Sequence, residues 1–321
     1  MRLVTRMLVS VCLFGISAGA FAAVAGDANG DGKSDLFWRN TSTGANYVWL
    51  MNGSTISSSG GIQSVPLSWG FEVAASGDYD GDGKTDLFWR STSGVNYIWY
   101  MDGLSIASQL QIDSLSTAWV AGPSGDFDGD GEDDLFFRNS STGHNLIWFS
   151  GTGTQAETNS ESDSAWKVVA VGDFSGDGKS DLMWRNEATG ADYVWFMDGT
   201  TVTYGASLPD VSILYGWVVK GAGDFNGDGK DELLWRSSVA EATVIWEFGT
   251  TITATTLSSG PEAVWNVRGV GDFNGDGKAD IFWRKGDSSG ENYMWFMNGT
   301  TVTSAQSVTS ATSDWTTVAP H

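Results

Sequence analysis

Asp272-Phe-Asn-Gly-Asp-Gly-Lys-Ala-Asp280 is one of six copies of an acidic loop that recurs along the 321-residue sequence. The shared pattern is D-x-[DNS]-x-D-G-x-x-[DE], so oxygen-bearing side chains occupy loop positions 1, 3, 5 and 9. Successive copies begin 47 to 51 residues apart, which indicates a repeat array. The copies span 27–35, 78–86, 126–134, 173–181, 224–232 and 272–280.

The spacing of these oxygens suits a hard cation such as Ca²⁺, which takes six to eight oxygen ligands in irregular geometry. We therefore expect up to six structural calcium ions, with the backbone carbonyl of position 7 completing each set. An EF-hand is excluded because position 12, Trp283 in the last copy, is not glutamate. Acidic turns without metal remain the alternative. The predicted ligands are Asp27, Asn29, Asp31, Lys33, Asp35, Asp78, Asp80, Asp82, Lys84, Asp86, Asp126, Asp128, Asp130, Glu132, Asp134, Asp173, Ser175, Asp177, Lys179, Asp181, Asp224, Asn226, Asp228, Lys230, Glu232, Asp272, Asn274, Asp276, Lys278 and Asp280.

The charge balance fits a metal-binding chain. The sequence has 39 acidic and 17 basic residues, a formal net charge of −22, and 20 of the acids lie at ligand positions of the loops. Three or four carboxylates crowded within each loop repel one another unless a cation compensates them. Nucleic acid is an unsuitable partner for such a surface, because phosphates require positive charge.

The N-terminus reads as a signal peptide over residues 1–22. Arg2 and Arg6 precede an apolar run, and Ala20-Phe-Ala22 is a small-x-small cleavage site. The run is too short to predict a transmembrane helix. Cys12, the only cysteine, lies inside this segment, so the mature chain has no disulfide to stabilise it. We expect an exported protein, secreted, periplasmic or attached to the cell surface.

Four short apolar runs rich in aromatic and β-branched residues fill each repeat, and they predict β-strands. In the fourth repeat they begin at Trp166, Asp181, Asp192 and near Thr200. The second and third runs are apolar on both faces, which is expected where sheets are covered on both sides. Residues 23–321 are therefore predicted to form one all-β domain, a six-bladed β-propeller of four-stranded antiparallel blades. Pairs such as Asn52-Gly53 predict a tight hairpin turn between the third and fourth strands.

The number of blades follows from the chain ends. An aromatic residue lies seven positions before the first loop aspartate in copies two to six, whereas the first copy has no room for one. The missing element recurs as Trp315-Thr-Thr-Val-Ala-Pro-His321. We expect this C-terminal strand to complete the first blade and close the ring. A truncated seventh blade is the alternative, and it would leave an open sheet edge.

The segment Gly271 to Asp280, followed by an apolar strand, resembles the FG-GAP/VCBS repeat. That repeat builds the propellers of integrin α-subunits, some fungal lectins and many bacterial secreted proteins. The resemblance implies Ca²⁺ in the loop between the first two strands of each blade, with ligands met on the opposite face. Ser175 and Glu232 depart from the pattern and imply weaker metal binding in copies four and five. Trp-Arg replaces the usual Gly-Ala-Pro after the second strand, so integrin-specific contacts are not implied.

Tryptophan and arginine also recur in register. Sixteen of the 17 tryptophans fall at three repeat positions, as packing between blades requires, and Trp69 alone is out of frame. Trp69 is therefore the predicted ligand-contacting aromatic. One arginine ends each second strand, either as a packing partner of the neighbouring tryptophan or as part of a ring of donors for a glycan. These arginines are Arg39, Arg90, Arg138, Arg185, Arg236 and Arg284.

Catalysis has little support in the sequence. The two histidines, His144 and His321, have no repeat counterparts, and no catalytic constellation stands out. The prediction is a secreted binding or adhesion module for carbohydrate or protein ligands. A polysaccharide-active, lyase-like enzyme on the same propeller is the alternative.

Overall fold

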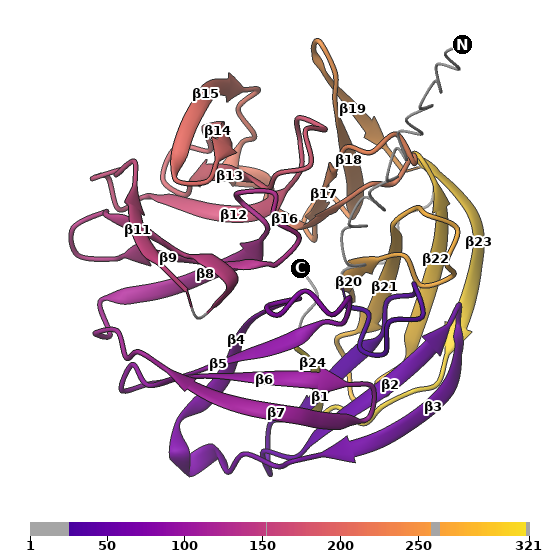
Figure 1. The fold of residues 1–321 in the computed structure, drawn as a ribbon. Coiled ribbons are helices and arrows are strands. Elements are labelled where there is room, and N and C mark those ends of the chain that lie inside the picture. Colours follow the sequence, from indigo (N-terminus) through magenta and orange to yellow (C-terminus); the bar gives the residue numbers. More distant parts are fainter. Residues whose placement is uncertain (1–25, 152, 258–263, 319–321) are drawn as a thin grey trace, which may run out of the picture.

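A computed structural model describes residues 26–151, 153–257 and 264–318, and the predicted signal peptide over residues 1–22 lies outside these ranges. Within them, 24 strands form six antiparallel sheets of four strands each. The sheets are arranged as blades around a central axis (Figure 1). The prediction of a six-bladed β-propeller is confirmed.

The blades follow one another along the chain, and the strands of each blade are named from the innermost outward. Blade 1 contains β24 (Trp315–Thr317), β1 (Leu36–Asn40), β2 (Asn46–Asn52) and β3 (Thr55–Ile62). Blade 2 contains β4 (Phe71–Gly77), β5 (Asp86–Ser91), β6 (Asn96–Asp102) and β7 (Ser105–Ile112). Blade 3 contains β8 (Trp119–Gly125), β9 (Asp134–Asn139), β10 (Asn145–Trp148) and β11 (Gln155–Thr158). Blade 4 contains β12 (Trp166–Gly172), β13 (Asp181–Asn186), β14 (Asp192–Asp198) and β15 (Thr201–Leu208); blade 5 contains β16 (Trp217–Gly223), β17 (Glu232–Ser237), β18 (Ala242–Phe248) and β19 (Ile252–Thr256); blade 6 contains β20 (Trp265–Gly271), β21 (Asp280–Lys285), β22 (Asn292–Asn298) and β23 (Thr301–Val308).

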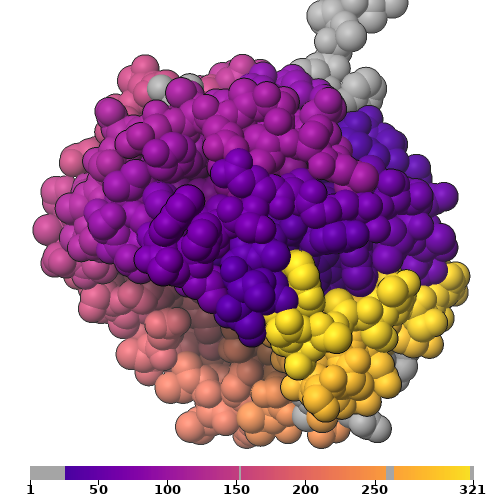
Figure 2. Space-filling view, turned by 90° about the horizontal axis from the view of Figure 1, so that it is seen from below, coloured from indigo at the N-terminus to yellow at the C-terminus, as the bar shows by residue number. Residues whose placement is uncertain are grey.

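The C-terminal strand closes the ring. β24 pairs antiparallel with β1, with Trp38 opposite Thr317 and Asn40 opposite Trp315. In the space-filling view the yellow C-terminal segment lies directly against the indigo first blade (Figure 2). The last strand therefore completes blade 1, as predicted, and does not begin a seventh blade.

Aromatic side chains fill the spaces between neighbouring blades. Trp89 and Trp99 of blade 2 are buried together with Phe37 and Val48 of blade 1. Every residue of β1 is buried, which explains why the second strand of a repeat is apolar on both faces. The packing role predicted for the in-frame tryptophans is confirmed at this interface, and its driving force is the removal of large apolar surfaces from water.

The tight hairpins differ in detail from the prediction. Asn52 pairs with Thr55, so the two loop residues are Gly53 and Ser54 and the asparagine ends the strand. Gly53 has φ of 62° whereas neither Asn52 nor Ser54 has positive φ, which is typical of a turn with glycine at its first central position. Glycine alone therefore supplies the left-handed conformation expected of the Asn-Gly pair.

Three short 3₁₀ helices, η1 (Leu67–Trp69), η2 (Phe149–Gly151) and η3 (Ile213–Tyr215), complete the described secondary structure. η1 and η3 connect the outermost strand of one blade to the innermost strand of the next. Across the part of the chain that the structure covers, no helix is long and apolar enough to cross a membrane.

Candidate functional sites on the two faces of the propeller

The acidic loops join the first and second strands of blades 2 to 6, and in blade 1 the loop precedes β1; all six lie together on one side of the ring, which we call the loop face. The carboxylate at position 1 organises each loop by accepting backbone N–H groups. In the first copy, Asp27 accepts from Gly30 at 2.7 Å and from Gly32 at 2.7 Å. Both glycines have positive φ (74° and 79°), which side chains disfavour. The loop thus needs glycine at positions 4 and 6, and although the sequence has glycine at both in every copy, the shared pattern recognised only position 6.

The carboxylate at position 9 is buried and ties the loop to the rest of the blade. Asp35 accepts the N–H of Ala28 at 2.9 Å and that of Met51, in β2, at 2.7 Å. The corresponding aspartates of the other loops make the same contact to the third strand or the residues that follow it, at 2.8–2.9 Å. The longer Glu232 accepts instead from Phe225 and Asn226 within its own loop. Position 9 is thus both a candidate ligand and a structural anchor.

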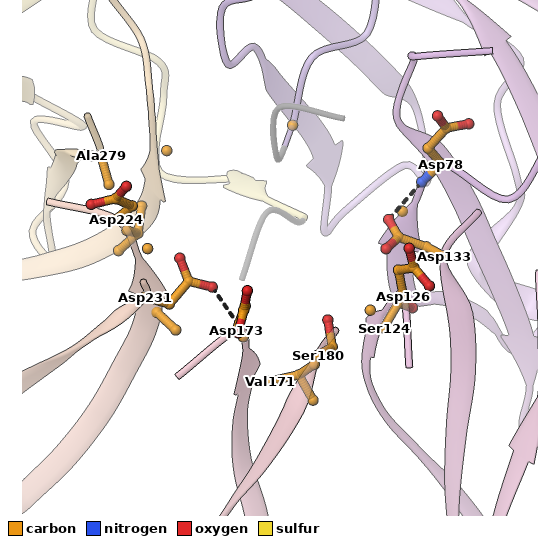
Figure 3. Close-up of a pocket in the computed structure, with 18 of the residues that line it drawn as sticks. Asp78, Ser124, Asp126, Asp133, Val171, Asp173, Ser180, Asp224, Asp231 and Ala279 are labelled. Carbon is orange, nitrogen blue, oxygen red and sulfur yellow. Dashed lines mark hydrogen bonds between the residues drawn. The ribbon is translucent and has the colours of Figure 1, made fainter. Parts of the chain in front are cut away.

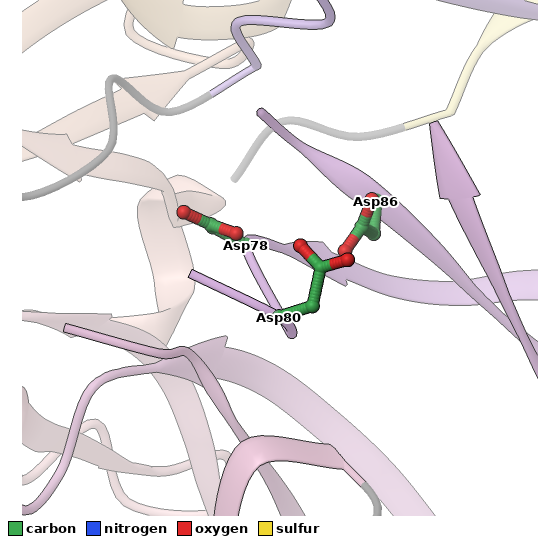
Figure 4. A group of neighbouring side chains, drawn as sticks. All are labelled: Asp78, Asp80 and Asp86. Atoms are coloured by element: carbon green, nitrogen blue, oxygen red, sulfur yellow. The ribbon is translucent and has the colours of Figure 1, made fainter. Parts of the chain in front are cut away.

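Carboxylates converge in the loops as a cation site requires. In three copies, three carboxylate groups each place an oxygen within 4.8 Å of the others; one of these clusters is Asp78, Asp80 and Asp86 (Figure 4). The other two clusters are Asp126, Asp128 and Asp134, and Asp224, Asp228 and Glu232. Position 3 is neutral in the first, fourth, fifth and sixth copies, where Asn29, Ser175, Asn226 or Asn274 offers an uncharged oxygen.

The carboxyls at position 9 lie in surroundings that disfavour their charged form. Burial, together with the neighbouring loop carboxylates, raises the pKa of Asp35, Asp181 and Asp280 to about 7. The same causes raise the pKa of Asp86, Asp134 and Glu232 to about 8. The higher values occur in the three loops with clustered carboxylates. A carboxylate in such surroundings requires a proton or a cation, and an all-oxygen donor set fits Ca²⁺.

The loops also join each blade to the next. Across the described chain, the N–H of position 8 donates to the carbonyl of position 1 in the preceding blade in all six loops, at 2.6–2.9 Å. Ser34 of blade 1 donates to Asp272 of blade 6, so the ring of hydrogen bonds is closed. In blades 3 and 5 the position-8 carboxylates of Asp133 and Asp231 additionally accept the N–H of Asp78 and Asp173 (Figure 3). We call this set of contacts the loop seam.

Side chains at position 7 strengthen the same seam. Lys84 lies against Gly30 of the preceding loop and forms ion pairs with Asp82 at 3.0 Å and Asp102 at 3.2 Å. The other lysines at this position lie against the corresponding glycine of the preceding blade, whereas Glu132 takes this place beside Gly81. The predicted ligand role belongs to the backbone carbonyl at position 7 and stays a prediction.

The six arginines point into the protein on the side of the ring away from the loops, which we call the opposite face. The guanidinium of Arg39 lies 5.0 Å from the ring centre of Trp89 in the next blade, and it donates to the carbonyls of Gly44 and Val65 and to Asn46. The other five stack on the corresponding aromatic ring at 5.0–5.7 Å. All are buried except Arg90, which is half-buried.

These contacts correct one expectation from the sequence. Arg39, Arg90, Arg138, Arg185, Arg236 and Arg284 do not form a ring of donors for a ligand, because their guanidinium groups are covered and engaged by aromatic faces and loop carbonyls. They act as packing residues between blades and hold the loops of the opposite face. The sequence had left both roles open.

Trp69 remains as a candidate ligand contact. It ends η1 on the opposite face and is 61% exposed. Together with Phe71, Tyr97 and Trp99 it lines a cavity of about 420 Å³ at the junction of blades 1 and 2. Gln63 and Gln109 lie at the same cavity, with Nε2 of Gln109 donating to Oε1 of Gln63 at 2.8 Å. Neither glutamine was predicted, because nothing in the repeat pattern distinguishes them.

His144 lies on the outer part of blade 3. Its Nδ1 is 3.6 Å from a carboxylate oxygen of Glu157, and both side chains are largely exposed. A solvated pair of this kind contributes little to stability. His321 lies outside the described residues.

Comparison with known proteins agrees with this architecture. The FG-GAP-like repeat family matches residues 27–89, 126–184, 173–235 and 224–283. No curated protein sequence matches the chain. Among solved structures, a lectin of Agrocybe aegerita that recognises non-reducing terminal N-acetylglucosamine is 14% identical, with a TM-score of 0.60, over 90% of this chain and 79% of the lectin. A chain of a nidogen/laminin complex is 11% identical, with a TM-score of 0.55, over 84% of this chain and 92% of the other. At these identities the likeness shows a shared fold.

Proposed function

Because this chain belongs to the FG-GAP-like repeat family, we propose that it is an exported, calcium-stabilised propeller that binds a glycan on its opposite face. The proposal has three parts: metal in the loops, a sugar at Trp69, and export. Each part has its own support and its own test.

The metal part rests on the donor set of the loops. The side-chain oxygens at positions 1, 3, 5 and 9 and the carbonyl at position 7 would hold Ca²⁺, and the ion would supply the positive charge that the buried position-9 carboxylate lacks. The raised pKa of Asp86 and the convergence of Asp78, Asp80 and Asp86 support this reading. Because the same loops form the loop seam, metal binding would stabilise the contacts between blades and not only the loops themselves.

The glycan part rests on one observation, the aromatic cavity at Trp69. An exposed indole can stack on the apolar face of a sugar ring, and a concave aromatic surface with a few polar groups is typical of small-ligand sites. The amides of Gln63 and Gln109 offer both donors and acceptors at the edge of this cavity, as hydroxyl recognition requires. The likeness to a lectin that recognises N-acetylglucosamine supports a saccharide as the ligand class.

A protein ligand is the second candidate, and a specific surface favours it. η3 presents Ile213, Leu214 and Tyr215 with exposed fractions of 45%, 81% and 57%. Val218 and Val239 are also exposed, and Val218 follows η3 closely in sequence. The likeness to a chain of the nidogen/laminin complex is compatible with such a partner.

Glycan binding is tested by titrating the protein with a panel of mono- and oligosaccharides, including N-acetylglucosamine. We expect binding that Trp69→Ala abolishes. Tyr215→Ala is the matched control, because Tyr215 ends the equivalent 3₁₀ helix and is similarly exposed but does not line the cavity. Equal loss of binding in both variants, or binding unaffected by Trp69→Ala, would refute the assignment of the site.

Export is proposed from the N-terminal segment, whose residues 1–22 carry the signal-peptide pattern. Expression of the full chain in a bacterial host should give a processed product outside the cytoplasm that begins at Ala23. N-terminal sequencing of the extracytoplasmic protein checks this, and an unprocessed chain retained in the cytoplasm would contradict it.

A further inference from the structure

The innermost strands carry an irregularity that the repeat pattern does not reveal. In β12, β16 and β20 the pairing with the second strand skips one residue, which is Val169, Lys220 and Arg268 respectively. β4 skips Ala74 at the same place, and β8 skips two residues. Such a β-bulge leaves the inserted residue unpaired and redirects its side chain. Each bulge therefore offers at least one residue that the sheet itself does not use.

Three of these bulge residues meet in one cavity. Val169, Lys220 and Arg268 line a space of about 310 Å³ among the innermost strands. Apolar wall around the two cationic side chains comes from Pro123, Val219 and Val267. β12, β16 and β20 belong to consecutive blades, and the inner strands of these blades are in contact. Lys220 and Arg268 consequently lie on neighbouring strands, at the same level of the central channel that the innermost strands surround.

The two cations have no negative partner. Among the described residues, neither side chain forms an ion pair or a hydrogen bond. Lys84, Lys179 and Lys285, by contrast, each contact a carboxylate. Burial, with further contributions from the nearby charges of Arg268 and Arg236, lowers the pKa of Lys220. Like charges held together in a concave, partly apolar space attract an anion.

We propose that this cavity binds a carboxylate, held between the Lys220 ammonium and the Arg268 guanidinium. Arginine matches the planar fork of a carboxylate, and lysine adds a point charge beside it. A singly charged group is favoured over phosphate because the loop-face end of the channel is lined by Asp133, Asp231 and the position-1 aspartates, which repel additional negative charge. The choice of a uronic acid as carrier of the carboxylate rests on the proposed glycan-binding function. This site is separate from the Trp69 cavity, with which it shares no lining residue.

The test is a calorimetric titration of the full mature protein with glucuronate and, in parallel, with glucuronamide, which has the same size and no charge. We expect glucuronate to bind and glucuronamide to bind at least about tenfold more weakly, since one charge-assisted contact is worth roughly that factor. Lys220→Gln and Arg268→Gln should each weaken glucuronate binding by about tenfold or more. Lys285→Gln is the control, because this lysine is already paired with Asp287 and Glu291 and lies outside the cavity. Removing one of two like charges should leave the melting temperature unchanged or raised, so lost binding cannot be attributed to misfolding.

A glucuronate-terminated oligosaccharide is titrated alongside the free sugar. Binding of the free sugar alone identifies a monosaccharide ligand, and binding of both identifies the end of an acidic polysaccharide. Equal affinity for glucuronate and glucuronamide, or unchanged affinity in Lys220→Gln and Arg268→Gln, would overturn the inference. If neutral glycans bind in a Trp69-dependent way while glucuronate does not bind, the proposed function stands and this inference alone fails.

Discussion

At the level of single residues, the arginine that lies one residue before the end of each second strand solves a problem set by the radial fold. The loops of the opposite face have no regular strand partner, so their carbonyls need donors. Arg185 supplies them to Gly190 and Val211 while its flat face covers Trp235 of the next blade. Because one side chain serves two blades, the position is occupied by arginine in every repeat.

Arg185 differs from the others in its partner, and the difference can be measured. Its guanidinium contacts the buried carboxylate of Asp192 at 2.8 Å, whereas Arg39 contacts the neutral Asn46. Arg185→Ala should lower the free energy of unfolding by about 3–5 kcal/mol, because it leaves a buried charge unpaired. Arg39→Ala should cost only about 1–3 kcal/mol. Urea denaturation at neutral to slightly alkaline pH measures both values.

The pH dependence of the stability difference between Arg185→Ala and Arg39→Ala provides the control for this comparison. Burial raises the pKa of Asp192 to about 6 even beside Arg185. Without the arginine the pKa of this carboxyl rises further, so Arg185→Ala should recover stability as the pH falls, beginning above about 6. Asp192→Asn, which restores the residue found at this position in blades 1, 2, 3 and 6, should be tolerated. A difference between the two alanine variants that does not change with pH would contradict this explanation.

The position-9 carboxyls predict how the calcium-free protein responds to pH. Their pKa values are raised to about 7 or 8 in the fold, as for Asp35 and Asp86, from 3.8 for an ordinary aspartate. Between about pH 4 and 8 the folded protein therefore binds more protons than the unfolded chain, and stability falls as pH rises through this window. The melting temperature in EDTA should be higher near the acidic end of this window than near its alkaline end. A rise in the melting temperature over the same interval would show that these carboxyls are not buried as described.

At the level of elements, the strands were predictable because their signals are local and repeated. Runs such as the one that forms β14 are short and apolar, and glycine-rich turns separate them. Their existence and order therefore follow from the pattern of apolar and turn residues alone. The pairing of β24 with β1 was predictable from one displaced aromatic, Trp315. The bulges that expose Lys220 and Arg268 could not be predicted, since a bulge depends on the register between two strands and leaves no mark in hydrophobic pattern.

The candidate functional sites also include a part that could be predicted from the sequence and a part that could not. The acidic loops were recognisable because all their predicted ligands lie within nine residues of one another. The Trp69 cavity combines Gln63 from the end of blade 1 with Tyr97 and Gln109 from blade 2, and such contacts form only once the blades are packed. The burial of the arginines likewise depends on the aromatic ring of the next blade, which lies against the guanidinium. The spacing of residues along the sequence could not show this contact.

Closure of the ring by β24 predicts a sharp effect of truncation. A chain ending at Thr312 removes β24 and leaves β1 with an unpaired edge against the channel. We expect loss of the cooperative thermal transition, or a melting temperature lower by about 10 °C or more, because several ladder bonds and the packing of Trp315 disappear together. Differential scanning calorimetry checks this. A chain ending at Val318 is the control and should melt like the full protein; equal stability of both truncated forms would show that β24 does not close the ring.

At the level of the whole molecule, the loop seam links metal binding to the integrity of the propeller. The position-8 N–H groups hold each loop to its neighbour through the carbonyl of position 1, the residue that also heads the predicted ligand set. A formal charge of −22 opposes compaction of the ring, and bound divalent cations would offset much of it. Stability should therefore depend on metal across all blades at once.

Chelation provides the corresponding experiment. Addition of EDTA should lower the melting temperature by about 10 °C or more, since ligands that bind only the folded state at concentrations far above Kd contribute several kcal/mol. Excess Ca²⁺ should restore it, and Mg²⁺ should do so less well because it requires stricter octahedral geometry. An unchanged transition in EDTA would count against structural calcium.

Calcium in the acidic loops can be located by an anomalous difference map from crystals grown in calcium chloride, recorded at a wavelength where calcium scatters anomalously. We expect peaks inside the loops, bounded by the oxygens of positions 1, 3, 5 and 9, and strongest in the loops beginning at Asp78 and Asp126, where four carboxylates are available. Loops without anomalous density in such crystals would contradict the proposal that metal holds the propeller together.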